Sequence, residues 1–155
     1  MGSKANIVLV HGAWADGSSW SKVIPLLQQK EINMTAAQIP LTSLVDDIAV
    51  TRNLLAAQKG PTILVGPSYA GVVISGAAND SPSVEALVYI AAFGLDEGES
   101  IDALSKQGPA PAGAAAVRPP TSMAFSGSIE MLSPKHLPPM RIRSKPASWL
   151  QCKSL

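Results

Sequence analysis

A serine at position 68 lies among small residues in the segment 64–71, which reads Leu-Val-Gly-Pro-Ser-Tyr-Ala-Gly. The run at 61–65 before it predicts a strand buried on both faces, because it is apolar and rich in β-branched residues. The stretch at 69–78 after it is small, apolar and free of proline, which predicts a buried helix. A serine at such a sharp turn projects its hydroxyl from the sheet. We interpret Ser68 as a candidate nucleophile, although the motif alone also fits a Gly/Ser loop between two core elements.

A second candidate feature is the loop at 11–14, His-Gly-Ala-Trp, which follows an apolar run at 6–10. Acyl transfer requires two backbone N–H donors aimed at a tetrahedral oxyanion. One comes from the residue after the nucleophile, and the other comes from a loop after an earlier strand. Tyr69 and Ala13 occupy those positions, so we predict that their amides form the oxyanion hole.

The chain resembles the α/β-hydrolase fold family, in particular the small esterases related to plant methyl esterases and hydroxynitrile lyases. The resemblance rests on the segments 8–14, 19–27, 66–71, 86–93 and 97–100. Segment 66–71 corresponds to the nucleophile elbow, where the family usually has histidine and glycine and this chain has Pro67 and Ala70. The resemblance implies a serine hydrolase that cleaves a small carboxylic ester through an acyl-enzyme. Carbon–carbon lyase chemistry of the hydroxynitrile type and a non-catalytic hydrolase-like binding module are the alternatives.

A complete catalytic triad is not recognisable in the sequence. A serine needs a base that removes its proton, and that base needs an orienting carboxylate. His136, the only histidine after Ser68, is a weak candidate base, since no strand pattern precedes it. Asp96 and Glu97 follow the last predicted strand and are weak candidates for the acid, but solvated loop charges are the favoured interpretation. His11 is also a weak candidate, because the family's order is Ser, acid, His, and a structural role in its loop is favoured.

Apolar runs and helical patterns alternate along the first part of the chain. The predicted strands are 6–11, 33–39, 61–66 and 84–92, and the predicted helices are about 19–30, 43–58 and 69–79. This alternation predicts an α/β fold with an open parallel sheet of about four strands, helices on both faces and loops of functional interest at the carboxyl edge. By resemblance, the strands match the third to sixth of an eight-stranded sheet, which is a partial α/β-hydrolase fold.

Some polar and aromatic side chains outside the motifs have structural interpretations. Asp46, Asp47 and Arg52 are expected on a solvated helix face. Trp14 and Trp20 could line an apolar pocket, and for Trp20 a place in the core is favoured.

The composition changes near residue 103. Residues 1–102 have five Lys/Arg and ten Asp/Glu. Residues 103–155 have seven Lys/Arg, one Asp/Glu and eight of the 13 prolines. We therefore predict an α/β-hydrolase core at 1–107 and a proline-rich basic tail at 108–155 of irregular structure. A shifted reading frame near 118–122, which would truncate and impair the hydrolase, is favoured over a genuine basic arm. Because the basic residues lie among prolines with only Trp149 as an aromatic neighbour, no nucleic-acid partner is expected.

Length and composition set the outer bounds. A chain of 155 residues with 46% hydrophobic residues can bury a core. The lone Cys152 excludes an intrachain disulfide, and no cofactor or metal is expected. No apolar segment reaches the roughly 20 residues of a membrane span, and the first strand begins early for a signal peptide, so a cytoplasmic location is predicted. The expected partners are a small-molecule ester and, through a sheet edge left exposed, a second copy of the chain.

Overall fold

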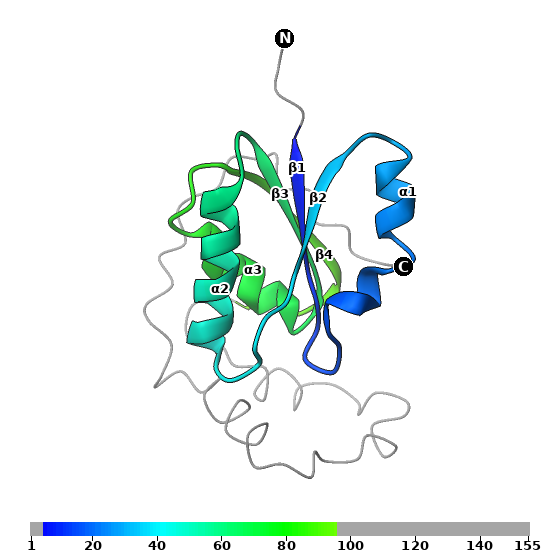
Figure 1. Cartoon of the computed structure of the whole chain (residues 1–155). Coiled ribbons are helices and arrows are strands. Elements are labelled where there is room, and N and C mark those ends of the chain that lie inside the picture. The colour runs from blue at the N-terminus through cyan, green and yellow to red at the C-terminus, as the bar shows by residue number, and fades with distance from the viewer. Residues whose placement is uncertain (1–4, 96–155) are drawn as a thin grey trace.

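The computed structural model describes residues 5–95, in which four parallel strands form one sheet between two layers of helix (Figure 1). The strands are β1 (Asn6–Val10), β2 (Asn33–Ala37), β3 (Thr62–Ser68) and β4 (Val84–Ala92), in the spatial order β2-β1-β3-β4. Every neighbouring pair is parallel. The predicted open parallel sheet is confirmed. The proposed tail and the residues Asp96, Glu97 and His136 lie outside the described residues.

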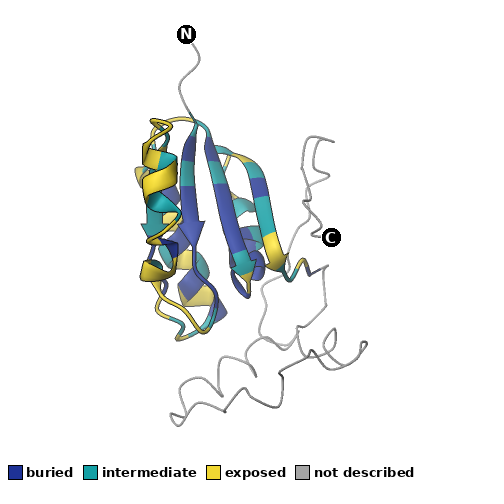
Figure 2. Ribbon diagram, turned by 90° about the vertical axis from the view of Figure 1, so that its right-hand side faces the viewer, coloured by how far each residue is buried: buried dark blue, intermediate teal, exposed yellow. Residues whose placement is uncertain are grey.

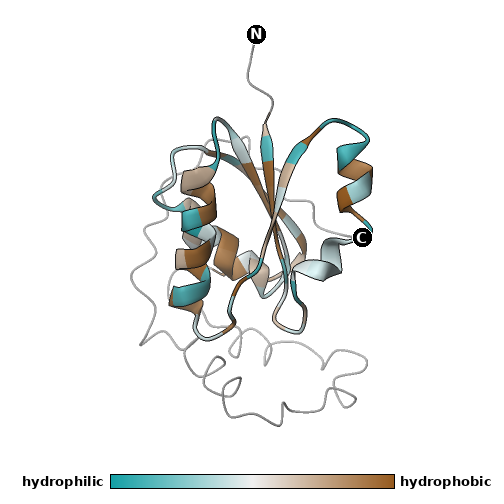
Figure 3. Cartoon of the chain, in the orientation of Figure 1, coloured by the Kyte–Doolittle hydropathy of each residue, from teal (hydrophilic) through white to brown (hydrophobic). Residues whose placement is uncertain are grey.

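The two faces of the sheet carry separate apolar layers. Val8, Val10 and Leu64 pack with residues of the helices α2 (Leu44–Ala57) and α3 (Ala70–Ala78). On the opposite face, Leu9 and Val65 pack under Trp20, in the 3₁₀ helix η1 (Gly17–Trp20), and under the short helix α1 (Ile24–Gln28). Alternate residues of a strand point to opposite faces, so continuous apolar runs in β1 and β3 supply both layers. Figure 3 shows hydrophobic stretches in brown along the strands and α3.

The predicted helix at 19–30 is interrupted. η1 ends at Trp20, and α1 begins only at Ile24, with Pro25 in its first turn. Proline has no amide hydrogen and its ring clashes with the preceding turn, so it is tolerated in the first turn of a helix but not in its interior. Trp20 itself is buried, with 8% of its surface exposed, as the core interpretation predicts.

The expectation for the polar residues of α2 is correct at two positions and wrong at the third. Asp46 and Arg52 are exposed, but Asp47 is fully buried. The buried residues of the helix are Leu44, Asp47, Thr51 and Leu55. Their spacing of three or four residues puts Asp47 on the same side of the helix as the two leucines, so its carboxylate enters the core.

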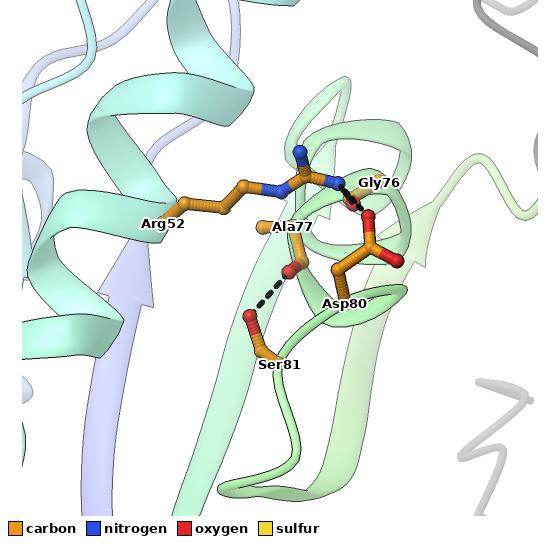
Figure 4. Close-up of polar contacts among 5 residues, drawn as sticks. All are labelled: Arg52, Gly76, Ala77, Asp80 and Ser81. Atoms are coloured by element: carbon orange, nitrogen blue, oxygen red, sulfur yellow. Dashed lines mark hydrogen bonds and ion pairs between the residues drawn. The ribbon is translucent and has the colours of Figure 1, made fainter.

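Arg52 joins α2 to the end of α3 (Figure 4). Its Nη2 donates to the Gly76 carbonyl at 2.9 Å and to Asp80 Oδ2 at 3.1 Å. The Ser81 hydroxyl donates to the Ala77 carbonyl at 2.8 Å. Carbonyls in the last turn of a helix have no partner within the helix, so these side chains complete the end of α3.

β4 lies at the edge of the described sheet. Within residues 5–95 it pairs only with β3. Figure 2 shows the central strands largely buried and exposed positions near the end of β4, where Ile90 and Ala91 lie. No helix that the structure describes has both the length and the apolar character needed to cross a membrane.

Candidate active site

Ser68 lies at the turn from β3 into α3. It is the last residue of the strand, its side chain is exposed, and its backbone has a positive φ of 49°. Tyr69 returns to ordinary helical angles, and α3 begins at Ala70. A positive φ in a residue other than glycine costs on the order of 1–3 kcal/mol and persists only where the surrounding structure imposes it. The strained strand-to-helix turn is the geometry that a nucleophile elbow requires.

Two glycines allow this turn to pack closely. A Cβ at Gly66 would lie 2.9 Å from the backbone carbon and oxygen of Ala70. A Cβ at Gly71 would overlap the carbonyl oxygen of Phe93. The Phe93 amide in turn donates to the Ser68 carbonyl at 3.1 Å, so the chain after β4 is attached to the elbow. Any side chain at either glycine would force backbone apart at the residue that carries the hydroxyl.

Pro67 is accommodated by its place in the sheet. β1 pairs with β3 only as far as Val65, so Pro67 lies beyond the part of β3 that has neighbours on both sides. Proline removes a ladder hydrogen bond from a central strand and is tolerated where pairing ends. The departure from the family pattern therefore does not prevent the strained turn at Ser68.

The loop at 11–14, called here the first loop, lies against the elbow. A Cβ at Gly12 would be 3.7 Å from Ser68 Cβ and 3.6 Å from the Pro67 carbonyl oxygen. The Gly12 carbonyl accepts the Ala15 amide at 3.2 Å, which closes a turn around Ala13 and Trp14. The first loop and the start of α3, the two segments predicted to supply the oxyanion donors, thus lie beside Ser68. Trp14 is 61% exposed there.

His11 is fully buried, and both of its ring nitrogens have partners. Nε2 accepts the Ile39 amide at 3.1 Å, and Nδ1 lies 2.9 Å from the Gly12 carbonyl oxygen. An amide N–H can only donate and a carbonyl can only accept, so the hydrogen sits on Nδ1 and the ring is neutral. In this arrangement neither nitrogen is available to take a proton from Ser68.

Sequence reasoning missed a buried pair behind the elbow. The Tyr69 hydroxyl donates to Asp47 Oδ2 at 2.6 Å, and Asp47 Oδ1 accepts the Leu41 amide at 2.8 Å. Burial raises the pKa of Asp47, although these two hydrogen bonds oppose the rise. Burial and the neighbouring carboxylate raise the pKa of Tyr69 above its ordinary value. The three-residue spacing from Leu44 was the available signal that Asp47 faces the core.

The chain is similar in sequence to the carbendazim hydrolyzing esterase of Nocardioides sp. (strain SG-4G). The two are 30% identical over 115 residues, which cover 64% of this chain and 47% of the esterase. The chain thus spans about half the length of this curated relative. No protein-family model matches it.

Solved structures share its fold. A pyrethroid hydrolase from Sphingobium faniae JZ-2 matches with a TM-score of 0.67 at 23% identity, over 76% of this chain and 53% of that one. An extracellular alpha/beta-hydrolase from a Paenibacillus species matches with a TM-score of 0.59 at 21% identity, over 68% and 47%. Tomato methylketone synthase I matches with the same TM-score and identity, over 68% and 46%. The parallel sheet, the strained serine turn and these matches together identify the chain as a protein with part of the α/β-hydrolase fold.

Proposed function

We propose that the protein is a serine hydrolase of small carboxylic esters in which Ser68 is the nucleophile. The observation that carries this proposal is the exposed, positive-φ serine at the strand-to-helix turn, with the first loop packed against it. Backbone strain of this kind concentrates at functional sites. The similarity to a carbendazim hydrolyzing esterase supports the choice of ester hydrolysis among the reactions of the fold.

The proposed reaction has two stages. Ser68 Oγ forms a bond to the ester carbonyl carbon while its proton passes to a base. The N–H groups of Ala13 and Tyr69 stabilise the negative charge on the carbonyl oxygen. They stand at the two positions from which an α/β-hydrolase supplies its oxyanion hole. The alkoxy group leaves as the alcohol after taking up the proton, and water then releases the acid from the acyl-serine. Trp14, exposed beside these donors, is a candidate wall for an apolar acyl group.

The base that would take the proton from Ser68, and the carboxylate that would orient this base, are still predictions. His136, Asp96 and Glu97 are the weak candidates, and all three lie outside the described residues. If the chain is truncated by a shifted reading frame, hydrolysis should be slow. An oxyanion hole and substrate binding alone leave roughly 10³ to 10⁴ of acceleration over water. Turnover at an ordinary enzymatic rate that His136→Ala abolishes would instead make His136 the base. Reading the downstream nucleotide sequence in all frames tests the origin of the tail.

Covalent labelling tests the nucleophile. A fluorophosphonate probe should modify Ser68, as located by peptide mass spectrometry, and Ser68→Ala should remove the label. Ser83→Ala is the matched control, because Ser83 directly precedes β4 and so lies at the amino end of the parallel strands, whereas Ser68 lies at the carboxyl end of β3. Hydroxynitrile lyase-type chemistry would appear as turnover of a cyanohydrin that labelling of Ser68 abolishes. Binding of esters with neither labelling nor turnover would support the non-catalytic binding module and refute the hydrolase.

Location and assembly are further proposals. We retain a cytoplasmic location as a prediction, which fractionation of the source cells would test. Self-association through β4 is proposed because this strand is paired on one side only within the described residues. Concentration-dependent oligomers in size-exclusion chromatography would support it, and a monomer at all concentrations would contradict it.

A further inference from the structure

A chain of hydrogen bonds connects the two segments that border Ser68. On one side, the buried Tyr69 hydroxyl is held by Asp47 of α2. Tyr69 directly follows the nucleophile, so its side chain and the proposed oxyanion amide belong to one residue. A buried tyrosine whose hydroxyl is bound at 2.6 Å is restricted to one side-chain orientation, and this restrains the backbone from which it extends.

On the other side, the series of hydrogen bonds extends from Asp47 to the first loop. Asp47 Oδ1 binds the amide of Leu41, a residue with a positive φ of 57°. Two residues earlier, the Ile39 amide binds Nε2 of His11, whose Nδ1 donates to the Gly12 carbonyl. The segment 39–41 therefore holds the elbow through Asp47 and the first loop through His11. Both bonds are made by buried side chains, where water cannot replace a lost partner.

We propose that Asp47 is a positioning residue, which fixes the Tyr69 amide relative to the first loop by binding the Tyr69 hydroxyl and the Leu41 amide together. The chemical consequence rests on the proposed function, because the two segments matter for catalysis only if they supply oxyanion donors. The positional claim does not, since it concerns the spacing of backbone segments and is measurable in an inactive protein.

The carboxylate suits this role better than an apolar residue. Both of its partners are donors, and an ionised carboxylate accepts at both oxygens without a hydrogen of its own. A residue that merely filled the core at position 47 would cost less to bury, because it would carry no charge to desolvate. The hydrogen bonds described for the Asp47 carboxylate go to Tyr69 and Leu41, so its effect on the site passes through Tyr69 and segment 39–41.

Two variants and one matched control test the inference. Tyr69→Phe removes only the hydroxyl, and Asp47→Asn keeps an acceptor for Leu41 but replaces the oxygen that accepts from Tyr69 with a donor. Tyr89→Phe is the control, because Tyr89 is half-buried and its hydroxyl is also hydrogen-bonded, to Ser75 at 2.7 Å, but no hydrogen bond described for it leads to segment 39–41. Each variant of the full chain is compared by amide hydrogen exchange in NMR, by the rate of fluorophosphonate labelling, and by thermal unfolding.

Tyr69→Phe and Asp47→Asn should speed exchange of the Ala13, Leu41 and Tyr69 amides about 10-fold more than Tyr89→Phe does. This difference should appear although the variants lower the melting temperature by comparable amounts. Labelling of Ser68 should slow by about 10- to 100-fold, since a displacement of about 1 Å at a site costs up to roughly 10²-fold. Equal effects of Tyr69→Phe and Tyr89→Phe on exchange would overturn the inference, as would unchanged labelling in Tyr69→Phe. Failure of the unmodified chain to be labelled would refute the proposed function instead, while the exchange data would still decide the positional claim.

Discussion

Replacing Gly71 by alanine tests whether close backbone contact maintains the elbow. The added methyl would overlap the Phe93 carbonyl oxygen and lie 2.8 Å from Ala92 Cβ. These atoms cannot rotate away as a side-chain end could. Ala92 is the last residue of β4, which is paired with β3, and Phe93 follows it. The Phe93 amide is also bound to the Ser68 carbonyl. The strain must therefore be relieved by moving the end of β4 or the start of α3.

The size of the effect follows from two opposing contributions. Extra methyl groups in a packed core typically cost about 1–3 kcal/mol, and the backbone overlap places Gly71→Ala at the upper end of this range, at about 3 kcal/mol. Alanine in a helix is favoured over glycine by at most about 1 kcal/mol. We expect a net loss of about 2 kcal/mol in the free energy of unfolding. Labelling of Ser68 should also slow, because the displaced segment is bonded to Ser68.

Gly76→Ala is the matched control in the same helix. Its methyl would overlap Cδ1 of Ile48, the end of a flexible side chain that another rotamer can move aside. A rotamer adjustment costs of order 0.5–1.5 kcal/mol, which the gain in helix propensity largely offsets. Equilibrium urea unfolding should show Gly71→Ala about 2 kcal/mol less stable than Gly76→Ala. The reasoning is refuted if the two variants are equally stable, or if Gly76→Ala is less stable than Gly71→Ala.

Three further predictions concern α2. Arg52→Ala should cost about 0.5–1.5 kcal/mol in urea unfolding because it loses a hydrogen bond to the end of α3, whereas Asp80→Asn should cost less because 81% of the Asp80 side chain is exposed; an equal loss would assign the effect to the ion pair. Ser43→Ala removes the N-cap of α2 and should cost about 1 kcal/mol, but Ser43→Gly only a few tenths; equal costs would contradict capping by the hydroxyl. Because burial raises the pKa of Asp47 above its usual 3.8, the folded chain binds that proton more tightly than the unfolded chain. The resulting stability is present below pH 3.8 and is lost as the pH rises through the folded-state pKa. The stability of the unmodified chain relative to Asp47→Asn should therefore fall from acid to neutral pH in urea unfolding, and a rise would contradict the direction of the shift.

Local patterns were sufficient to predict the elements that hold the site. The β-branched runs at 6–10 and 61–65 indicate buried strands because such side chains fill both faces of a parallel sheet. Glycine and alanine around Ser68 indicate a close strand-to-helix turn because no larger side chain fits there. Pro25, which is tolerated only in the first turn of a helix, was also visible in the sequence, but the predicted helix at 19–30 ran through it.

The partners of buried polar groups were decided only by the tertiary structure. Nothing near His11 in the sequence shows that the Ile39 amide occupies its Nε2, because the two residues are 28 positions apart. Asp47 was assigned to solvent from its charge, yet folding places it against Tyr69, 22 positions away. Periodicity reports the local backbone and the average polarity of a face, so the sequence by itself determined where Ser68 stands. Which donor meets which acceptor depends on how distant segments pack, because a buried carboxylate is stable only where folding brings donors to it.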